Sequence, residues 1–291
     1  MSVDFSKLIL VTGASGKTGR EVVANLVKAG ARVRAFVRRA EAQDELLAAG
    51  AAEASLGDLQ DAEALRRAVA GVEQVIHISP PMHPAEDEIT QRLIGDCINA
   101  DVARFVLYSV LHPAVHVPHH QRKARAELTL IDSGLPYTIL QPCRYMQHLL
   151  PIWKQVVESG VHSMPFDVNA KFSLVDLKDL AEASCNVLTQ SGHEFATYQL
   201  CGPQLLSQAD CASILTRYLG RKVVAEEKSL DAFRADAEKS GMPAWRVDTM
   251  MTMNAHYGAH GLIGNSNVLR WLLGREPTDF GSFLARNFPR S

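Results

Sequence analysis

The sequence predicts an α/β fold, in which a parallel sheet flanked by helices is followed by a smaller, mostly helical C-terminal lobe. Two observations predict this class. In the first half of the 291 residues, short apolar runs alternate with helical patterns, and such units form right-handed crossovers and a buried parallel sheet. After about Pro142, helical patterns dominate. We therefore expect two fused domains, residues 1–150 and 151–291, between which the chain is free to cross.

Each expected strand of the sheet is a short, largely apolar run, and each expected helix follows with apolar residues at helical spacing. The strands are expected at residues 7–13, 32–39, 52–58, 73–80, 104–110 and 136–142. The helices are expected at residues 17–30, 41–50, 60–71, about 85–100, and 119–134. In the first of these helices, Val22 and Leu26 share one side, and Gly30 ends the helix.

The C-terminal lobe is expected to contain few strands. Its helices are predicted at residues 177–190, 207–220, 229–241 and 278–288. Its strands are predicted at residues 171–176, 197–202 and 222–226. The glycine-rich segment 256–267, "HYGAHGLIGNSN", is predicted to be a plain loop, with a mobile substrate lid as the alternative.

The composition is that of a soluble globular protein. Apolar residues make up 47% and charged residues 21%, and the net charge of −2 gives no attraction for nucleic acid or anionic lipid. No apolar run approaches the roughly 18 residues of a membrane span, and the start "MSVDFSKLILVTGASG" lacks a cleavable signal. The five cysteines form no C-x-x-C pair. We expect a cytoplasmic protein without disulfides or a zinc site, and homo-oligomer formation is left open.

Three glycines, Gly13, Gly16 and Gly19, stand in "VTGASGKTG", between the first expected strand and the first expected helix. Glycine permits a tight turn and lets a pyrophosphate approach the backbone, and the helix N-terminus offers free N–H groups. A phosphate-binding P-loop would need a glycine at position 11, which is Val11. The segment predicts a Rossmann-like dinucleotide site, and the alternative is that the glycines only form a turn.

The end of the second expected strand indicates which dinucleotide is bound. An acidic residue there would bind a ribose 2′-hydroxyl, but "FVRRAE" places Arg38 and Arg39 at this position. A guanidinium suits a 2′-phosphate, so we expect NADP(H), with NAD(H) less favoured. The alternative is that the arginines are solvated charges at a helix start. Asp58, after the third strand, either meets the adenine or caps the next helix.

The stretch "HHQRKARAE" places Lys123 on a helix that follows the fifth expected strand. Its ammonium could hold the nicotinamide ribose and favour a developing oxyanion; the alternative is a surface lysine paired with Glu127, one turn later. His119 lies one turn before Lys123 and is interpreted as the proton donor, as an orienting partner, or as a helix-start residue without chemistry. Ser109 either polarises a substrate carbonyl or satisfies the strand end.

Other side chains near this region have weaker functional interpretations. Tyr108 is expected to pack, because side chains alternate along a strand. Tyr145 either reaches the pocket or lies in the core, and Cys143 is expected to be inert. Four histidines lie close together in the sequence, but prolines interrupt any helix that would align them and no metal motif is present. We therefore expect no metal site from His112, His116, His119 and His120.

The sequence resembles the NmrA-like branch of the atypical short-chain dehydrogenases. The resemblance rests on "VTGASGKTG", "GDLQDAEALRRAVAGVEQVIHIS", "LYSVLHP", "HHQRKARAE", "SGLPYTILQPCRYMQHLL" and "YQLCGPQLLSQADCASILTRYLGRKV", which span nearly the whole chain. Many related dehydrogenases have a tyrosine four residues before the lysine, where this chain has His119. Conventional acid catalysis by tyrosine is therefore in doubt.

The resemblance also implies which residues contact the cofactor, NADP(H) or NAD(H). They are Gly13, Ser15, Gly16, Lys17, Thr18, Gly19, Arg38, Asp58, Leu59, Ser79, Pro80 and Lys123, with Tyr145 and Gln147 bordering the nicotinamide. Catalytic roles are predicted for Lys123, His119 and Ser109. The family contains both reductases and cofactor-sensing regulators. We therefore expect an NADPH-dependent reductase of a small apolar or aromatic carbonyl, quinone or conjugated substrate, with a non-catalytic NADP(H) sensor as the alternative.

Overall fold

The computed structural model describes residues 7–289. Expectations about residues 1–6 and 290–291, including the missing signal at the start, lie outside this range. The described chain packs into two compact units. The first contains residues 7–114, 120–141 and 180–198, and the second contains residues 115–119, 142–179 and 199–289. The units interleave along the chain, so they are a different division from the expected domains, 1–150 and 151–291, which remain a prediction.

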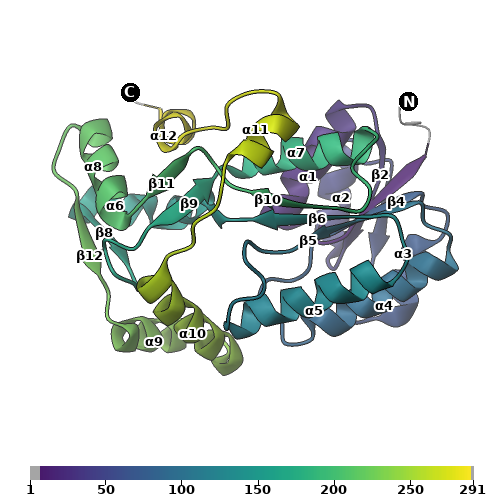
Figure 1. The fold of residues 1–291 in the computed structure, drawn as a ribbon, viewed down its shortest axis with the longest axis horizontal. Coiled ribbons are helices and arrows are strands. Elements are labelled where there is room, and N and C mark those ends of the chain that lie inside the picture. The colour runs from purple at the N-terminus through teal and green to yellow at the C-terminus, as the bar shows by residue number, and fades with distance from the viewer. Residues whose placement is uncertain (1–6, 290–291) are drawn as a thin grey trace. The chain divides into compact units, whose positions relative to one another are not determined.

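The first unit is built on a seven-stranded sheet with the strand order β3-β2-β1-β4-β5-β6-β10 (Figure 1). Its strands are β1 (Leu8–Val11), β2 (Arg32–Val37), β3 (Glu53–Leu56), β4 (Gln74–His77), β5 (Arg104–Tyr108), β6 (Tyr137–Pro142) and β10 (Ala196–Leu200). Strands β1 to β6 pair in parallel, so the predicted Rossmann-like class is confirmed. The strand order reverses between β1 and β4, and sheets of this kind bind ligands at the carboxyl ends of the strands at that point.

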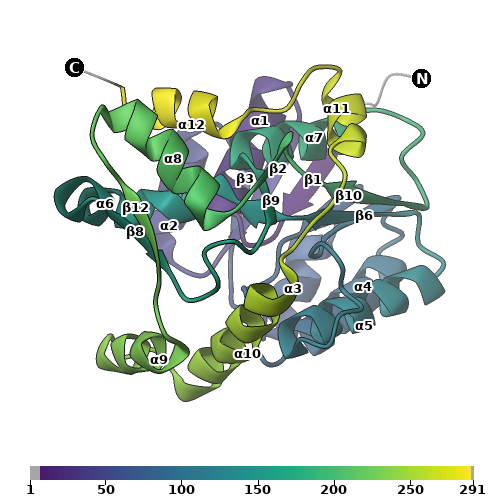
Figure 2. The same cartoon turned by 60° about the vertical axis from the view of Figure 1, so that its left-hand side comes forward.

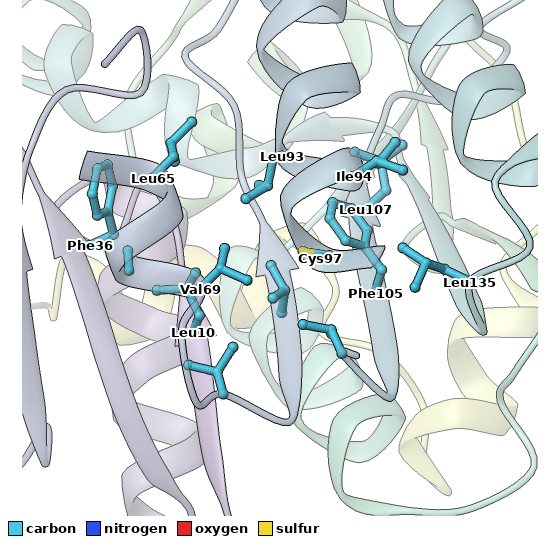
Figure 3. Packing of buried hydrophobic residues seen from close by; sticks show 14 of the residues in the cluster. Leu10, Phe36, Leu65, Val69, Leu93, Ile94, Cys97, Phe105, Leu107 and Leu135 are labelled. Atoms are coloured by element: carbon cyan, nitrogen blue, oxygen red, sulfur yellow. The ribbon is translucent and has the colours of Figure 1, made fainter. Parts of the chain in front are cut away.

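Helices cover both faces of this sheet. Those on one face are α3 (Ala62–Val69), α4 (Glu86–Asn99) and α5 (Pro118–Asp132). Figure 3 shows Leu65, Leu93 and Phe105 in the core between these helices and the strands. On the other face lie α1 (Lys17–Lys28), α2 (Ala40–Ala48) and the part of α7 (Leu177–Thr189) that belongs to the first unit. Because both faces are covered, the central strand β1 is apolar and buried at every position, and it reads as a continuous apolar run in the sequence.

A buried arginine ties α7 to the sheet. The guanidinium of Arg104, in β5, donates to the backbone oxygens of Val187 at 2.6 Å and Gln190 at 3.0 Å. These oxygens lie at the C-terminal end of α7, where helix carbonyls have no partner within the helix. Arg104 therefore satisfies the helix end and fixes α7 against the first unit, although α7 comes much later in the chain.

The second unit contains more strand than the sequence predicted. Its three-stranded sheet is β11-β9-β7 and its two-stranded sheet is β12-β8. The strands are β7 (Arg144–Tyr145), β8 (Val161–Met164), β9 (Phe172–Val175), β11 (Gln204–Leu206) and β12 (Val224–Glu227). The helices are η1 (Met146–Ile152), α6 (Trp153–Ser159), α8 (Gln208–Leu219), α9 (Leu230–Lys239), α10 (Ala244–His260), α11 (Asn267–Leu273) and α12 (Phe280–Asn287), several visible in Figure 2. None of the helices within residues 7–289 is long and apolar enough to cross a membrane.

The segment 256–267 is only partly the predicted loop. Helix α10 continues to His260, because the buried side chains Asn254 and Tyr257 hold its last turns to the second unit. Gly261 then ends the helix with a φ of 66°, and a Cβ at this position would lie 2.3 Å from the backbone oxygen of Lys171. Here packing overrides the helix-weakening effect of glycine and histidine.

Candidate functional site

The glycine loop joins β1 to α1, and its shape depends on two of its glycines. Gly13 has a φ of 61°, and a Cβ on it would lie 2.4 Å from the backbone oxygen of Ile78, beyond β4. A Cβ on Gly19 would lie 2.2 Å from the backbone oxygen of Gly13. A side chain at either position would push the loop away from β4 or from α1. Both glycines are therefore required by close backbone approach.

The N-terminus of α1 has room for an anion. Gly16 is its N-cap residue, and no side chain caps the free N–H groups of the first turn. A Cβ on Gly16 would meet only the backbone oxygen of Gly13, at 3.2 Å. Ser15 and Thr18 are half-buried here, and Lys17 is exposed. Uncapped N–H groups and the helix dipole favour a negatively charged group, so the loop fits a pyrophosphate.

The residues predicted to choose between the dinucleotides lie at the ends of β2 and β3. The guanidinium of Arg38 is 78% exposed, and its Nη1 lies 3.8 Å from Oδ2 of Asp58. Arg39 is the N-cap residue of α2, which matches its alternative interpretation as a helix-start charge. Asp58 does not cap α3; that role belongs to Asp61. Arg38 is therefore free to move toward a phosphate at the cost of a weak surface interaction.

Two further predicted contact residues follow the strands β3 and β4. Leu59 is half-buried and packs against the core of the first unit. Pro80, after β4, is half-buried, and its backbone oxygen accepts from His83 N at 3.3 Å. Both residues follow the carboxyl end of a strand, where this fold places its ligand.

The ammonium group of Lys123 is buried at the carboxyl ends of β4 and β5. Its Nζ donates to Ser79 Oγ at 2.9 Å and to the backbone oxygen of Tyr108 at 2.9 Å. It also forms an ion pair with the carboxylate of Glu86. Lys123 is 6% exposed and Glu86 is 0% exposed. Because an ammonium has three protons to donate, these three partners hold Lys123 in one position.

Glu86 is a site residue that the sequence analysis missed. It is the first residue of α4, where the helix dipole stabilises a carboxylate. The acidic start of α4 was visible in the sequence, but an acidic first turn is common to many helices. Glu127, the alternative partner of Lys123, instead accepts from Gln141 Nε2 at 3.0 Å through each of its two oxygens.

A second buried carboxyl group lies near Ser109. Burial raises the pKa of Glu127, and the neighbouring side chains of Ser109 and Gln141 lower it by less. Ser109 is 7% exposed, and its backbone N–H donates to the oxygen of Leu140 at 2.8 Å. The hydroxyl of Ser109 lies beside Glu127 but has no hydrogen-bond partner among the described residues. Tyr108 is buried, as predicted for a packing residue.

The buried side chain of His77 contacts Thr12, the residue that precedes the glycine loop. His77 Nδ1 lies 2.8 Å from Thr12 Oγ1, and His77 Nε2 lies 3.1 Å from Thr90 Oγ1. Thr12 Oγ1 also accepts from the backbone N–H of Ile78 at 3.0 Å. Burial, together with the charge of Lys123, lowers the pKa of His77 to about 3. His77 is therefore neutral at physiological pH and links β1, β4 and α4.

The other predicted site residues are not part of this cluster. His119 is the second residue of α5 and is half-buried, one helical turn before Lys123. Tyr145 and Gln147 belong to the second unit. Gln147 is 8% exposed, and its amide binds Asp176 Oδ1 at 2.7 Å. Within residues 7–289, no three side chains of the metal-binding types come together, and the cysteines of that range are buried and unbridged.

We predict that Lys123 and Glu86 are strongly coupled in stability. Removing either partner alone, as in Lys123→Met or Glu86→Leu, leaves a buried charge and should cost about 3–5 kcal/mol. The double variant should cost less than the sum of the two. The exposed pair Arg125–Asp87 joins the same two helices and is a matched control, worth about 0–1 kcal/mol. Urea unfolding of all variants measures this, and additive effects at Lys123 and Glu86 would contradict it.

We also predict that the protein loses stability as the pH falls below about 6.5. Burial lowers the pKa of His77 to about 3 and that of His162 to about 4, whereas an unfolded histidine titrates near 6.5. Below that pH the two histidines bind protons in the unfolded chain but stay neutral in the native protein. Each histidine therefore lowers the unfolding free energy by up to roughly 1.4 kcal/mol per pH unit. We expect the unfolding free energy, measured by urea titration at several pH values between neutral pH and pH 5, to fall less steeply with decreasing pH in His77→Asn than in wild type. An unchanged dependence on pH would refute the lowered pKa of His77.

Comparisons with known proteins agree with this geometry. Residues 5–284 match the model of the NmrA-like family. A curated "NAD(P)H azoreductase" of Xenophilus azovorans is 31% identical over 278 residues, covering 95% of this chain and 96% of the relative. "Quinone oxidoreductase 2" of Escherichia coli is 28% identical over 293 residues, covering 97% of this chain and 99% of the relative.

Solved structures show the same similarity. The NADPH-dependent quinone oxidoreductase QOR2 of Escherichia coli, solved with NADPH, has a TM-score of 0.86 at 26% identity and covers 96% of this chain and 99% of its own. The triphenylmethane reductase of Citrobacter sp., solved with NADP(H), has a TM-score of 0.85 at 25% identity with the same coverage. The transcriptional regulator NmrA, solved with NAD, has a TM-score of 0.81 at 18% identity, covers 97% of this chain and 95% of its own, and supports the fold alone. The chain belongs to the NmrA-like family.

Proposed function

We propose that this protein is an NADPH-dependent reductase of small aromatic substrates, such as quinones or azo and triphenylmethane dyes. One observation carries the proposal: the buried Lys123 ammonium lies in a polar cluster at the carboxyl ends of β4 and β5, next to the switch point and its uncapped helix N-terminus. The named activities of the azoreductase, quinone oxidoreductase and triphenylmethane reductase relatives support the same reaction class. A cytoplasmic location and a lack of nucleic-acid partners remain parts of this proposal.

The cofactor would be held by residues along the carboxyl edge of the first sheet. The glycine loop and the N-terminus of α1 would bind the pyrophosphate, through Gly13, Ser15, Gly16, Lys17, Thr18 and Gly19. Arg38 would bind the 2′-phosphate, and Asp58 and Leu59 would border the adenine. Ser79, Pro80 and Lys123 would contact the nicotinamide half. Tyr145 and Gln147 are retained as residues bordering the nicotinamide because the family resemblance implies it.

Lys123 would organise the chemistry of this site. A bound NADPH supplies the hydride, so the protein must orient the substrate and manage a proton. The ammonium of Lys123 is fixed by Ser79, Tyr108 and Glu86, so its charge is already in place when an oxyanion develops on the substrate. Ser109 would polarise the substrate oxygen. His119, at the start of the same helix, would donate the proton.

A cofactor-sensing regulator is the second candidate. The observation that favours it is the histidine at position 119, where active relatives of the wider superfamily have tyrosine. The experiment that separates the two functions mixes the purified protein with NADPH and menadione and follows NADPH absorbance. Steady consumption of NADPH supports the reductase. Tight NADPH binding without consumption, across quinones, azo dyes and triphenylmethane dyes, would support the regulator.

We predict that Arg38 selects NADPH over NADH. A charge-assisted hydrogen bond to the 2′-phosphate is worth about 1.5–3 kcal/mol, so Arg38→Ala should weaken NADPH binding by about 10- to 100-fold and leave NADH binding nearly unchanged. Arg67→Ala removes another exposed arginine, on α3, and is the matched control. Calorimetric titrations with both cofactors measure the effect. Equal losses for NADPH and NADH would remove Arg38 from this role.

We predict that Lys123 and His119 act on turnover more than on cofactor binding. Lys123→Met should keep much of the NADPH affinity, because the adenosine half is untouched, but should lose most turnover. His119→Phe should lower the rate about 100-fold, within the usual contribution of a general acid. His120→Phe, at the neighbouring buried histidine, controls for disruption of the helix start. Wild-type turnover in His119→Phe would show that the proton comes from another group.

A further inference from the structure

The second unit contains a cavity, lined in part by Tyr145, whose charged and polar groups have no role in the proposed reductase chemistry. It has a volume of about 40 Å³ and lies entirely among residues 142–179 and 199–289. A water needs about 10–15 Å³ of such space, so the cavity has room for a group of roughly three heavy atoms. Apolar side chains form most of its wall, but Arg144, His162 and Gln208 also line it.

Arg144 brings a positive charge into this cavity without a carboxylate to balance it. Its guanidinium lies over the rings of Phe166, at 4.8 Å from the centroid, and Phe172, at 5.2 Å. Its Nη2 lies 3.7 Å from the sulfur of Met164, which is a weak acceptor. Within residues 7–289, no Asp or Glu forms an ion pair with Arg144. Burial lowers the pKa of Arg144 to about 10, so the group still carries its charge at neutral pH.

Two other side chains that line the cavity each have a buried polar atom without a hydrogen-bond partner. His162 is 8% exposed, and its Nδ1 has no hydrogen-bond partner among the described residues. Gln208 is 3% exposed, and its Nε2 donates to the backbone oxygens of His162, at 2.5 Å, and Glu226, at 2.7 Å. This fixes the amide and leaves its Oε1 without a partner in the described structure. Buried polar atoms are nearly always paired, so two unpaired ones at a cavity that is also lined by the Arg144 guanidinium indicate a ligand.

We propose that this cavity binds the carboxylate group of a small aromatic molecule. Arg144 would pair with the negative charge, and neutral His162 would donate its ring N–H to an oxygen. Gln208 Oε1 would accept from a hydroxyl or water that accompanies the anion. The cavity is too small for a ring system, so only the charged group enters it, against the phenyl rings of Phe166 and Phe172. This anion site does not depend on the proposed reductase function.

Benzoate tests the binding site without any requirement for turnover. Calorimetric titration of the full chain should show benzoate binding, and Arg144→Met should weaken it by about 10- to 100-fold, the loss expected for a charge-assisted pair. Lys154→Met removes an exposed lysine from α6, in the same unit, and should leave the affinity unchanged. Benzyl alcohol should not bind more weakly to Arg144→Met than to wild type. No benzoate binding by wild type, or equal binding by Arg144→Met, would overturn the proposal.

Met164→Glu supplies a second variant that retains the arginine. A carboxylate beside Arg144 would pair with it, so benzoate binding should fall as in Arg144→Met while the fold is kept. Unchanged benzoate binding by this variant, with circular dichroism like that of wild type, would also overturn the proposal.

Discussion

The buried ammonium of Lys123 is the interaction on which the candidate site depends. A charge taken out of water is tolerated only when its partners are placed to replace the lost solvation. Here those partners come from the end of β4, the end of β5 and the first turn of α4, while Lys123 itself is on α5. The requirement to solvate one ammonium therefore fixes four elements relative to one another. The site is organised before any ligand arrives.

The surrounding polar groups extend the same constraint. His77 joins Thr12, in the first loop, to Thr90 on α4, and Gln141 joins the end of β6 to Glu127 on α5. Each link is buried, so breaking it would leave an unpaired polar atom in an apolar environment. The carboxyl ends of β1, β4, β5 and β6 are thus cross-linked by side chains. A rigid edge of this kind is what positions a nicotinamide ring reproducibly against a substrate.

The parts of this structure that the sequence predicted are those set by local rules. The parallel sheet, the loop at Gly13 and Gly19, and the helix that carries Lys123 follow from apolar period, glycine geometry and crossover handedness. Glu86 could not be found in this way, because its partner is far along the chain and only the fold brings them together. The short strands β8 and β11 of the second unit were missed because four or three residues carry too little pattern. Helix α10 was not among the predicted helices, and its last turns lie in a segment predicted as a loop, because buried Tyr257 outweighs the local glycine.

The interleaving of the two units has a consequence for how the protein is made. Residues 180–198 supply most of α7 and most of β10 to the first unit, but the ribosome synthesises residues 142–179, which belong to the second unit, before them. The newly synthesised first unit therefore cannot complete its fold until residues 180–198 emerge. Until then one face of its sheet is incompletely covered, and Arg104 lacks the backbone oxygens at the end of α7 that accept its hydrogen bonds. Exposed apolar surface of this kind aggregates, and closing such distant contacts is slow. Chaperone occupancy during translation should thus peak before α7 emerges and fall once β10 has joined the sheet.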